Sequence, residues 1–239
     1  MNDRTRNKQE IYDAAAAQWW SDDLRWVRTL KNLVPARLKF FDRHIDWAGK
    51  SVLDLGCAGG FMAEAIAQRG AHVTGIDPAK EAIAAARSHA AQSGLDIRYD
   101  TGVGEALPYD DAAFDAVVCV DVLEHVSDLG QVLQEVARVL KPGGLFLYDT
   151  INRNMVARLA TITVAEDILG LLPKGTHDPA MFIKPAELTD GLQQAGLTPG
   201  KMAGLGPTGL TRRLDFTFGV LPFKRVIYIG AARKPEATT

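Results

Sequence analysis

The stretch Ser51-Val-Leu-Asp-Leu-Gly-Cys-Ala-Gly-Gly60 decides the fold of this chain. Its first half, Ser51–Leu55, is short and mostly apolar, which is typical of a strand buried on both faces. The glycines of Gly56–Gly60 let the backbone turn sharply and approach a ligand where a Cβ would intrude. A helix over residues 61–69 follows directly. This order predicts an open α/β sheet that binds its ligand at the carboxyl ends of the strands.

Strands and helices alternate along the rest of the chain. Further strands are expected near residues 72–76, 96–99, 114–120, 145–148, 199–205 and 225–232. Further helices are expected at 8–20, 29–44, 79–91, 128–140, 154–172 and 185–194. Such alternation implies parallel strands joined by right-handed crossovers. The sequence therefore predicts an α/β fold with a Rossmann-like, doubly wound, seven-stranded sheet in a three-layer sandwich.

Composition limits the partners. The 239 residues are 47% hydrophobic, enough for one domain with a substantial core. The 27 basic and 29 acidic residues nearly balance, so we expect a small-molecule partner and no nucleic acid. Cys57 and Cys119 lie at strand ends, and neither a signal-peptide core nor a membrane-length apolar stretch occurs. We expect a cytoplasmic protein whose membrane contact is peripheral at most, with no signal for an oligomeric state.

Two acids bear on the ligand of the glycine turn. Asp77 ends the second expected strand, 21 positions after Gly56, where it can accept hydrogen bonds from both hydroxyls of an adenosine ribose. Nicotinamide dinucleotides are held similarly, but their G-x-G-x-x-G pattern is not met, because Ala58 and Gly59 follow Gly56. Asp54, two residues before that glycine, suits a cationic ligand and opposes a pyrophosphate. These details favour a sulfonium donor, and a NAD-dependent oxidoreductase is the alternative.

A series of motifs resembles the class I S-adenosylmethionine-dependent methyltransferases: Val52–Gly60, Gly75–Asp77, Ala106–Tyr109, Phe114–Asp115, Val122–Val126 and Leu140–Gly144. A narrower set resembles the ubiquinone-biosynthesis (demethylubiquinol) O-methyltransferase family: Trp19-Trp20, Pro35–Leu38, Ile151–Asn154, Pro173–Asp178 and Phe182–Leu188. The resemblance implies S-adenosylmethionine as methyl donor, S-adenosylhomocysteine as product and an aromatic hydroxyl as acceptor. With the strand–helix pattern, we expect a single domain over 1–239 with four parts: a helical N-terminal cover (1–48), a donor-binding core (49–150), an acceptor lid insertion (151–184) and a C-terminal helix with closing strands (185–239).

The resemblance also assigns residues to the donor. Gly56 and Asp77 are expected to bind it. Arg37 is expected to contact its methionine carboxylate, and Val120 to pack on its adenine. The remaining candidates lie on or beside the same turns: Asp54, Cys57, Ala58, Gly59, Pro78, Gly104 and Glu105.

Two residues depart from the family pattern. Ala58 stands where many relatives have glycine, a change that a backbone φ below zero would tolerate. Val103 stands where many relatives have an acid that holds the adenine amino group. We therefore expect Glu105 or backbone groups to recognise the adenine.

Methyl transfer from a sulfonium is an in-line displacement, so the protein must align the reacting atoms and exclude water. A hydroxyl acceptor also benefits from a general base. His125, after the fourth strand, is one candidate, and a hydrogen-bonded structural histidine is the alternative. His177 is the other, beside Asp178, which could raise its basicity. The alternative there is a polar turn ordered by Gly175.

A metal could instead lower the pKa of the acceptor hydroxyl. Asp121, Glu124 and His125 could together bind Mg²⁺ or Zn²⁺, and the resemblance supports such a site. Asp121 is shorter than the glutamate of the family at this position. Acids at i and i+3 with an adjacent histidine can otherwise cap a helix.

The insertion is rich in apolar residues that are expected to line an acceptor pocket or to pack on the sheet: Met155, Val156, Leu159, Ile162, Ile168, Leu169, Leu171, Leu172, Met181 and Phe182. Such a lining suits an aromatic acceptor. The leading hypothesis is O-methylation of a phenol, catechol or quinol. The alternative within the superfamily is a natural-product methyltransferase acting on a polyketide, sugar or amine.

Overall fold

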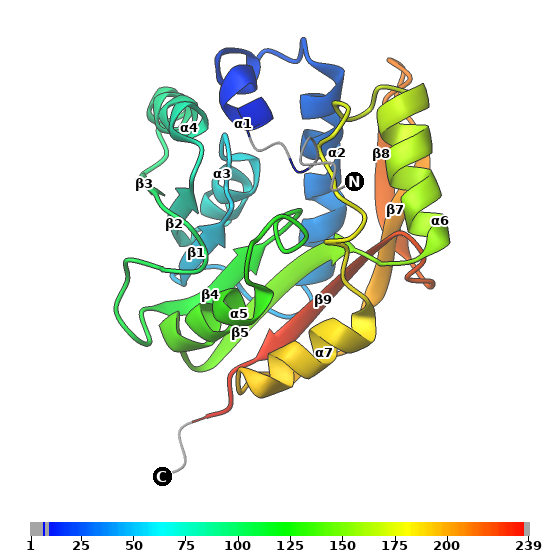
Figure 1. Cartoon of the computed structure of the whole chain (residues 1–239). Helices are drawn as coiled ribbons and strands as arrows, with labels where there is room; N and C mark the ends of the chain where they lie inside the picture. Colours follow the sequence, from blue (N-terminus) through cyan, green and yellow to red (C-terminus); the bar gives the residue numbers. More distant parts are fainter. Residues whose placement is uncertain (1–6, 8–9, 237–239) are drawn as a thin grey trace.

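The computed structural model describes residue 7 and residues 10–236 (Figure 1). A helical cover precedes the sheet and consists of α1 (Glu10–Ala15), the 3₁₀ turn η1 (Ala16–Gln18) and α2 (Arg25–Phe41). The helix predicted at 8–20 is thus divided, and its residues 8–9 lie outside the described part. α2 begins and ends earlier than the predicted 29–44. Its first turn is fixed by Trp26, whose ring meets that of Trp19 edge-on at 5.8 Å.

The central sheet has the strand order β3-β2-β1-β4-β5-β9-β7-β8, and β6 pairs with β9. Its strands are β1 (Ser51–Leu55), β2 (His72–Asp77), β3 (Ile97–Thr101), β4 (Phe114–Cys119), β5 (Leu140–Ile151), β6 (Thr198–Pro199), β7 (Ala203–Leu210), β8 (Phe216–Leu221) and β9 (Ile227–Arg233). The strands β1 to β5 are parallel, and β9 is antiparallel to β5. After β3 the chain returns to place β4 on the other side of β1. This reversal creates a ligand-binding crevice at the carboxyl ends of β1 and β4.

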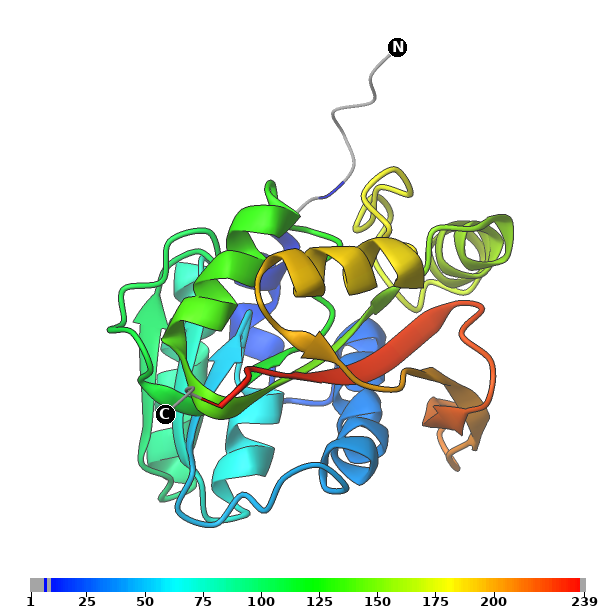
Figure 2. The ribbon, with the colours of Figure 1, turned by 90° about the horizontal axis from the view of Figure 1, so that it is seen from below.

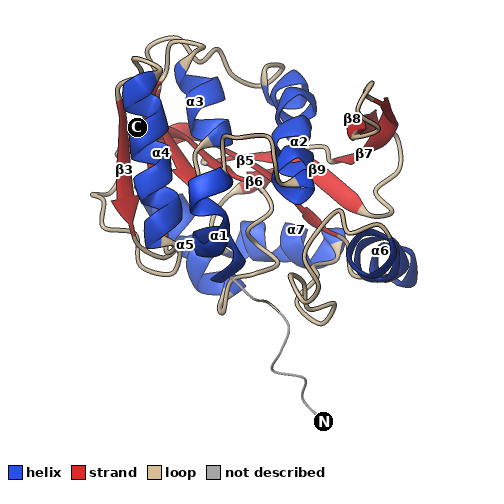
Figure 3. Ribbon diagram, turned by 90° about the horizontal axis from the view of Figure 1, so that it is seen from above, coloured by secondary structure: helices blue, strands red, loops and turns tan. Residues whose placement is uncertain are grey.

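Helices cover both faces of the sheet (Figures 2 and 3). One apolar core joins the sheet to α2, α3 (Phe61–Ala67) and α4 (Lys80–Gln92), and the other joins it to α5 (Leu129–Val139) and α7 (Pro185–Gln194). Successive residues of β1 serve opposite cores, since Val52 packs in the first and Leu53 in the second. The predicted Rossmann-like, three-layer α/β sandwich is confirmed.

The predicted number of seven strands is wrong, because the described part of the chain forms a sheet of nine. The strand expected at 199–205 is split into β6 and β7, and β8 was not predicted. All six side chains of β8 are half-buried, so its sequence lacks the alternation that marks a strand with one buried face. Tertiary contacts with α2 hold β8 in place. The Asn32 amide donates to the Phe216 carbonyl, and Arg28 pairs with Asp215 at 2.9 Å.

The insertion between β5 and α7 forms a helix and a loop. α6 (Met155–Arg158) is capped by Asn154, whose side chain accepts from the Ala157 amide. It continues as the wide π-helix η2 (Leu159–Ile168). The predicted helix at 154–172 therefore ends at residue 168. Loop residues then lead through Phe182 to α7. Among the described residues, no helix is long and apolar enough to cross a bilayer.

Candidate active site

A cavity of about 680 Å³ opens at the carboxyl ends of β1, β2 and β4. Its walls come from the N-terminal cover, the glycine turn after β1, the end of β2 and the loops that follow β3 and β4. Met181 contributes from the insertion. The cavity thus lies at the switch point that the topology creates.

The glycine turn is fixed by packing against neighbouring elements. Gly56 has φ +75°, and a Cβ there would lie 2.2 Å from a methyl of Val122. A Cβ at Gly59 would lie 2.3 Å from the Trp19 ring, and the Trp20 indole donates to the Gly59 carbonyl at 3.0 Å. These glycines are therefore required by the approach of the loop after β4 and of the cover.

The backbone φ at Ala58 is not below zero, which was the condition for tolerating alanine at this position. Its φ is +42°, in the left-handed region that costs a residue with a Cβ about 1–2 kcal/mol. The Ala58 amide donates to the Asp77 carboxylate at 2.8 Å, and the Ala79 amide donates to the other oxygen of Asp77 at 2.8 Å. Asp77 therefore fixes the strained turn while it lines the cavity.

The carboxylates of Asp54 and Asp77 give the cavity a buried negative end. Burial raises the pKa of Asp77, and the two backbone hydrogen bonds oppose that rise. Asp54 is 1% exposed, and neither of its carboxylate oxygens has a hydrogen-bond partner among the described residues. Burial, with the nearby Asp77 charge, raises the pKa of Asp54 to about 7. A buried, unpartnered carboxylate that lines a cavity fits a cationic ligand.

The cavity brings together nearly all of the residues predicted for the donor. It is lined by Arg37, Asp54, Gly56, Cys57, Ala58, Asp77, Pro78, Gly104, Glu105 and Val120. Gly59 is not part of the lining, because Trp19 covers it. Val103 lines the cavity and is 45% exposed, while one oxygen of Glu105 accepts from the amide and hydroxyl of Ser127.

Arg37 has internal partners in addition to its place in the lining. Its guanidinium bonds to Asp149 at 2.6 Å and to Asp121 at 2.5 Å, and the residue is 2% exposed. Burial by itself would lower the pKa of Arg37, but the two carboxylates outweigh burial, and the pKa lies above its ordinary value. The predicted contact of Arg37 with a methionine carboxylate stays a prediction.

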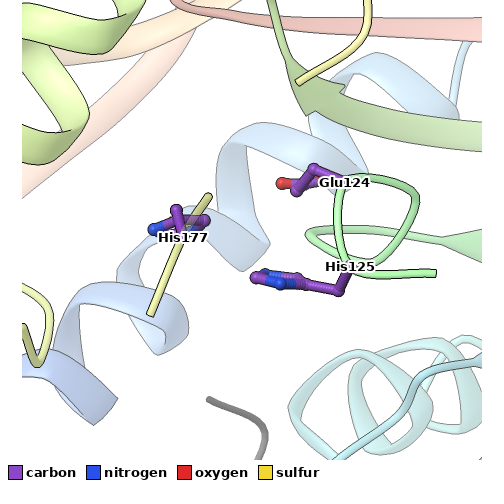
Figure 4. A group of neighbouring side chains, drawn as sticks. All are labelled: Glu124, His125 and His177. Atoms are coloured by element: carbon purple, nitrogen blue, oxygen red, sulfur yellow. The ribbon is translucent and has the colours of Figure 1, made fainter. Parts of the chain in front are cut away.

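Glu124, His125 and His177 form a second group, of which His125 lines the cavity (Figure 4). One ligand atom from each lies within 4.8 Å of the others, and all three residues are buried. Glu124 and His125 come from the loop after β4, and His177 from the insertion. Asp121, predicted as a partner of Glu124 and His125, is directed to Arg37 instead. His177 thus occupies the place expected for Asp121, because the insertion folds back over the end of the sheet.

The environment sets the protonation of this group. Glu124 accepts from the Thr150 hydroxyl at 2.7 Å through one oxygen, and the other has no partner among the described residues. Burial and the Asp121 charge raise the pKa of Glu124 to about 8. Burial, together with the charge of His177, lowers the pKa of His125 to about 3. His125 is therefore neutral at pH 7, and its Nδ1 lies 2.5 Å from the side-chain oxygen of Asn7.

Several site residues were missed in the sequence. Tyr12 lines the cavity, and its ring lies 6.2 Å from Trp19 and 6.0 Å from Trp26. Nothing around Tyr12 in the sequence marks it as a site residue. Asp149 lies near the carboxyl end of β5 and is 0% exposed, so the reasoning that selected Asp77 could have found it. The insertion also carries the buried Glu166, for which an acid inside an apolar run was the available signal.

Most of the apolar residues of the insertion do not line the cavity. Met155, Leu159 and Ile168 are 58–74% exposed, and Ile162 and Phe182 pack with Ile151 in a small separate core. Met181 is the residue of the predicted set that lines the cavity. Of the two alternatives for this set, packing fits Ile162 and Phe182 and a cavity lining fits Met181. Neither fits Met155, Leu159 and Ile168, which lie at the surface.

Comparison with known proteins agrees with this architecture. Residues 53–148 match the family described as a methyltransferase domain. The ubiquinone biosynthesis O-methyltransferase of Chromobacterium violaceum is 43% identical over 84% of this chain and 87% of that protein. The protein of the same name from Marinobacter nauticus is 39% identical over 89% and 91%. A Thermotoga maritima structure described as an S-adenosylmethionine-dependent methyltransferase superposes with a TM-score of 0.67, at 17% identity, over 94% and 98% of the two chains.

Fold, cavity and family match together define an S-adenosylmethionine-dependent methyltransferase. Identities near 40% over most of both chains are more specific than the fold. This chain belongs to the ubiquinone biosynthesis O-methyltransferase family. The predicted class and family are thereby confirmed, and the NAD-dependent oxidoreductase is not supported. Fold alone does not decide the reaction, since the [4+2]-cyclase SpnF superposes with a TM-score of 0.66 at 20% identity.

Proposed function

We propose that this chain transfers a methyl group from S-adenosylmethionine to a ring hydroxyl of a phenol, catechol or quinol. The observation that carries the proposal is that one cavity joins the unpartnered carboxylate of Asp54 to the group containing His125. The names of the relatives support an oxygen acceptor and a quinone-related substrate. The fold neighbours do not decide the acceptor, since the Thermotoga maritima structure is described as a possible histamine N-methyltransferase.

The donor end provides charge and positioning. Asp54 would face the positively charged methionine part of the donor, since no described side chain pairs with its carboxylate. Asp77 retains lone pairs for the ribose hydroxyls beyond those used by Ala58 and Ala79. When bound, the donor supplies an activated methyl group, whose bond to sulfur breaks as the new carbon–oxygen bond forms and whose electron pair stays on sulfur.

The acceptor end manages the proton. The ring hydroxyl must lose a proton as its oxygen attacks, and a histidine within reach can accept it. His125 is a weak base, because its pKa is lowered to about 3. We therefore assign the proton to the pair of histidines, of which His125 lines the cavity and His177 is buried beside it, with ring centroids 5.0 Å apart. Val122 and Met181 supply apolar lining for an aromatic ring.

A metal ion is part of this proposal. The partnerless oxygen of Glu124 fits a cation, and His125 and His177 would complete the set. One carboxylate and two imidazoles suit Zn²⁺ better than Mg²⁺, which prefers oxygen ligands. With the ion bound, the histidines would serve as ligands and not as the proton acceptor, and the ion would lower the pKa of the acceptor hydroxyl so that its proton could leave to solvent. Asp121 is not part of this ligand set, since it is held by Arg37.

The division of the chain follows the same roles. We propose that residues 1–48 cover the site, 49–150 bind the donor, 151–184 form the acceptor lid and 185–239 complete the sheet. A cytoplasmic location is proposed because Cys57 and Cys119 are both buried and free. The partner is a small aromatic hydroxyl compound, without nucleic acid and with membrane contact that is peripheral at most.

The test is a transfer assay with labelled donor over catechols, quinols and hydroxybenzoates, with and without a chelator. We expect label on the oxygen of at least one of these classes. Activity lost on chelation and restored best by Zn²⁺ would support the metal. Transfer only to amines or sugars would overturn the acceptor assignment. Binding of NAD but not of S-adenosylmethionine would overturn the donor assignment.

A further inference from the structure

The N-terminal cover brings two hydrogen-bond donors to the cavity that the proposed mechanism does not use. Tyr12 of α1 and Trp19, which follows η1, both line the cavity. Trp19 is 2% exposed, and its indole Nε1 has no hydrogen-bond partner among the described residues. The Tyr12 hydroxyl makes no hydrogen bond within the described part of the chain either. A buried polar group without a partner is costly, so a ligand in the cavity is the natural partner of both.

One contact fixes α1, which carries Tyr12, against α4. The carboxylate of Asp13 accepts from the Glu81 amide at 2.8 Å and from the Ala82 amide at 3.3 Å. These amides belong to the first turn of α4, where the N-cap residue provides no side-chain hydrogen bond. Asp13 therefore caps α4 from another helix, and α1 lies beside α4 (Figure 1).

A second set of contacts fixes Trp19 and Trp20 on the glycine turn. The Trp20 indole donates to the Gly59 carbonyl, and its ring stacks on His89 of α4 with centroids 3.5 Å apart and planes 1° apart. Trp19 covers Gly59, and its Nε1 is among the atoms nearest to that glycine. The ring of Tyr12 lies 6.2 Å from that of Trp19. Both donors are therefore held at the donor end of the cavity, over the glycine turn.

The charges that line the cavity leave one part of the donor without a matching group. S-adenosylmethionine carries an ammonium group, for which Asp54 is proposed, and a carboxylate. Arg37 is the one lysine or arginine among the described lining residues, and it already pairs with Asp149 and Asp121. Six acids also line the cavity: Glu10, Asp13, Asp54, Asp77, Glu105 and Asp121. A ligand carboxylate in such surroundings needs hydrogen-bond donors beyond Arg37.

The other side-chain donors of the lining have partners within the protein. The Asn7 amide donates to the His125 carbonyl at 3.2 Å, and the side-chain oxygen of Asn7 lies against the His125 ring. The Ser127 hydroxyl donates to Glu105 at 2.7 Å. Burial and the charges of nearby acids, Asp121 first, raise the pKa of Tyr12, so its hydroxyl keeps its proton and can donate.

We propose that the Tyr12 hydroxyl and the Trp19 indole N–H donate hydrogen bonds to the methionine carboxylate of S-adenosylmethionine, so that the N-terminal cover is part of the donor-binding site. Both groups are neutral, so they hold the carboxylate beside Arg37 without adding charge near the reacting sulfonium. Neither takes part in methyl transfer. The inference depends on S-adenosylmethionine as donor and not on the identity of the acceptor.

The test measures Kd by calorimetric titration of the full-length chain with two donors, in the absence of an acceptor. One is S-adenosylmethionine, and the other is decarboxylated S-adenosylmethionine, which keeps the sulfonium and the ammonium but lacks the carboxylate. We expect Tyr12→Phe and Trp19→Phe each to raise Kd for S-adenosylmethionine about 10-fold, because a hydrogen bond to a charged group is lost. Kd for the decarboxylated donor should stay within about twofold of the parent value.

The matched control is Tyr148→Phe. Tyr148 is a buried tyrosine whose hydroxyl also has no partner among the described residues, but it does not line the cavity. This variant should leave Kd for both donors unchanged. If Trp19→Phe fails to fold, benzothienylalanine at position 19 keeps the two-ring shape of the indole and removes only its N–H.

The ratio of the two Kd values separates a lost contact from a disturbed cover. A cover that is merely loosened weakens the binding of both donors by the same factor. Equal factors for the two donors, in either the Tyr12 or the Trp19 variant, would therefore overturn the proposal. An unchanged Kd for S-adenosylmethionine in either variant would overturn it as well.

Discussion

The donor half and the acceptor half of the cavity are built in different ways. The donor half is local, since the turn after β1 bonds to Asp77 at the end of β2, the next strand in the chain. The acceptor half is assembled from Glu124 and His125 after β4 and from His177 in the insertion. The first half is centred on one crossover unit, against which the cover and the loop after β4 pack, and the second depends on the lid being folded in place. Changes in the lid should therefore affect turnover more than donor affinity.

Replacing His177 with alanine is the strongest test of that separation. We expect kcat to fall about 10²–10⁴-fold, because the histidine pair that accepts the proton is broken. The Kd for S-adenosylmethionine should stay the same, since the donor end does not include this residue. Steady-state kinetics and calorimetric titration measure the two quantities. His72→Ala, at the exposed start of β2, is the control. An unchanged rate would remove His177 from the mechanism.

Replacing Arg37 tests whether both halves of the cavity depend on the same buried ion pair, since Arg37 joins α2 to Asp121 and Asp149. Arg37→Ala leaves the buried Asp149 and the half-buried Asp121 without their cation, and we expect a loss of about 3–5 kcal/mol in the free energy of unfolding. Urea denaturation measures it. The control is Arg98→Ala, which breaks an exposed pair with Asp100 and should cost less than about 1 kcal/mol. Equal losses in the two variants would show that the buried ion pair contributes no more to the free energy of unfolding than an exposed one.

The pH dependence of donor binding tests the donor half alone. The pKa of Asp54 is raised from its ordinary value of 3.8 to about 7. Its ionisation therefore destabilises the free protein increasingly between these pH values and fully above the higher one. A cationic donor binds the ionised form, so its affinity should fall by up to about tenfold for each pH unit below 7. Titrations from pH 5.5 to 8 with Asp54→Asn as control measure this, and a flat profile for the parent chain contradicts it.

The smallest expected effect concerns the strained turn. Ala58→Gly should raise the free energy of unfolding by about 1 kcal/mol, because glycine adopts a positive φ without the cost that a Cβ brings. Ala65→Gly in the middle of α3 should have the opposite sign, since glycine weakens a helix by a similar amount. Thermal or urea unfolding compares the two. A destabilised Ala58→Gly variant would mean that the alanine methyl packs usefully in the turn.

Sequence reasoning succeeded where function and local structure coincide. Gly56 and Asp77 could be placed at one cavity from their spacing, because the neighbouring parallel strands β1 and β2 end at the same edge of the sheet. Their binding of the donor stays a prediction. It failed where a residue's partner is distant. Asp121 was grouped with Glu124 and His125 by proximity in the chain, whereas its φ of +54° and its bond to Arg37 take its side chain elsewhere.

The sequence by itself determined the doubly wound sheet, the glycine turn and the chemistry of the donor, because each depends on short-range periodicity and on residues within one crossover. The tertiary structure alone decided that Glu166 contacts His177, which histidine joins Glu124 and His125, and why Gly59 must be glycine. The physical reason is the same in each case. A buried polar group or a close backbone approach is satisfied by whatever folding brings within reach, and that neighbour is set by topology rather than by distance along the chain.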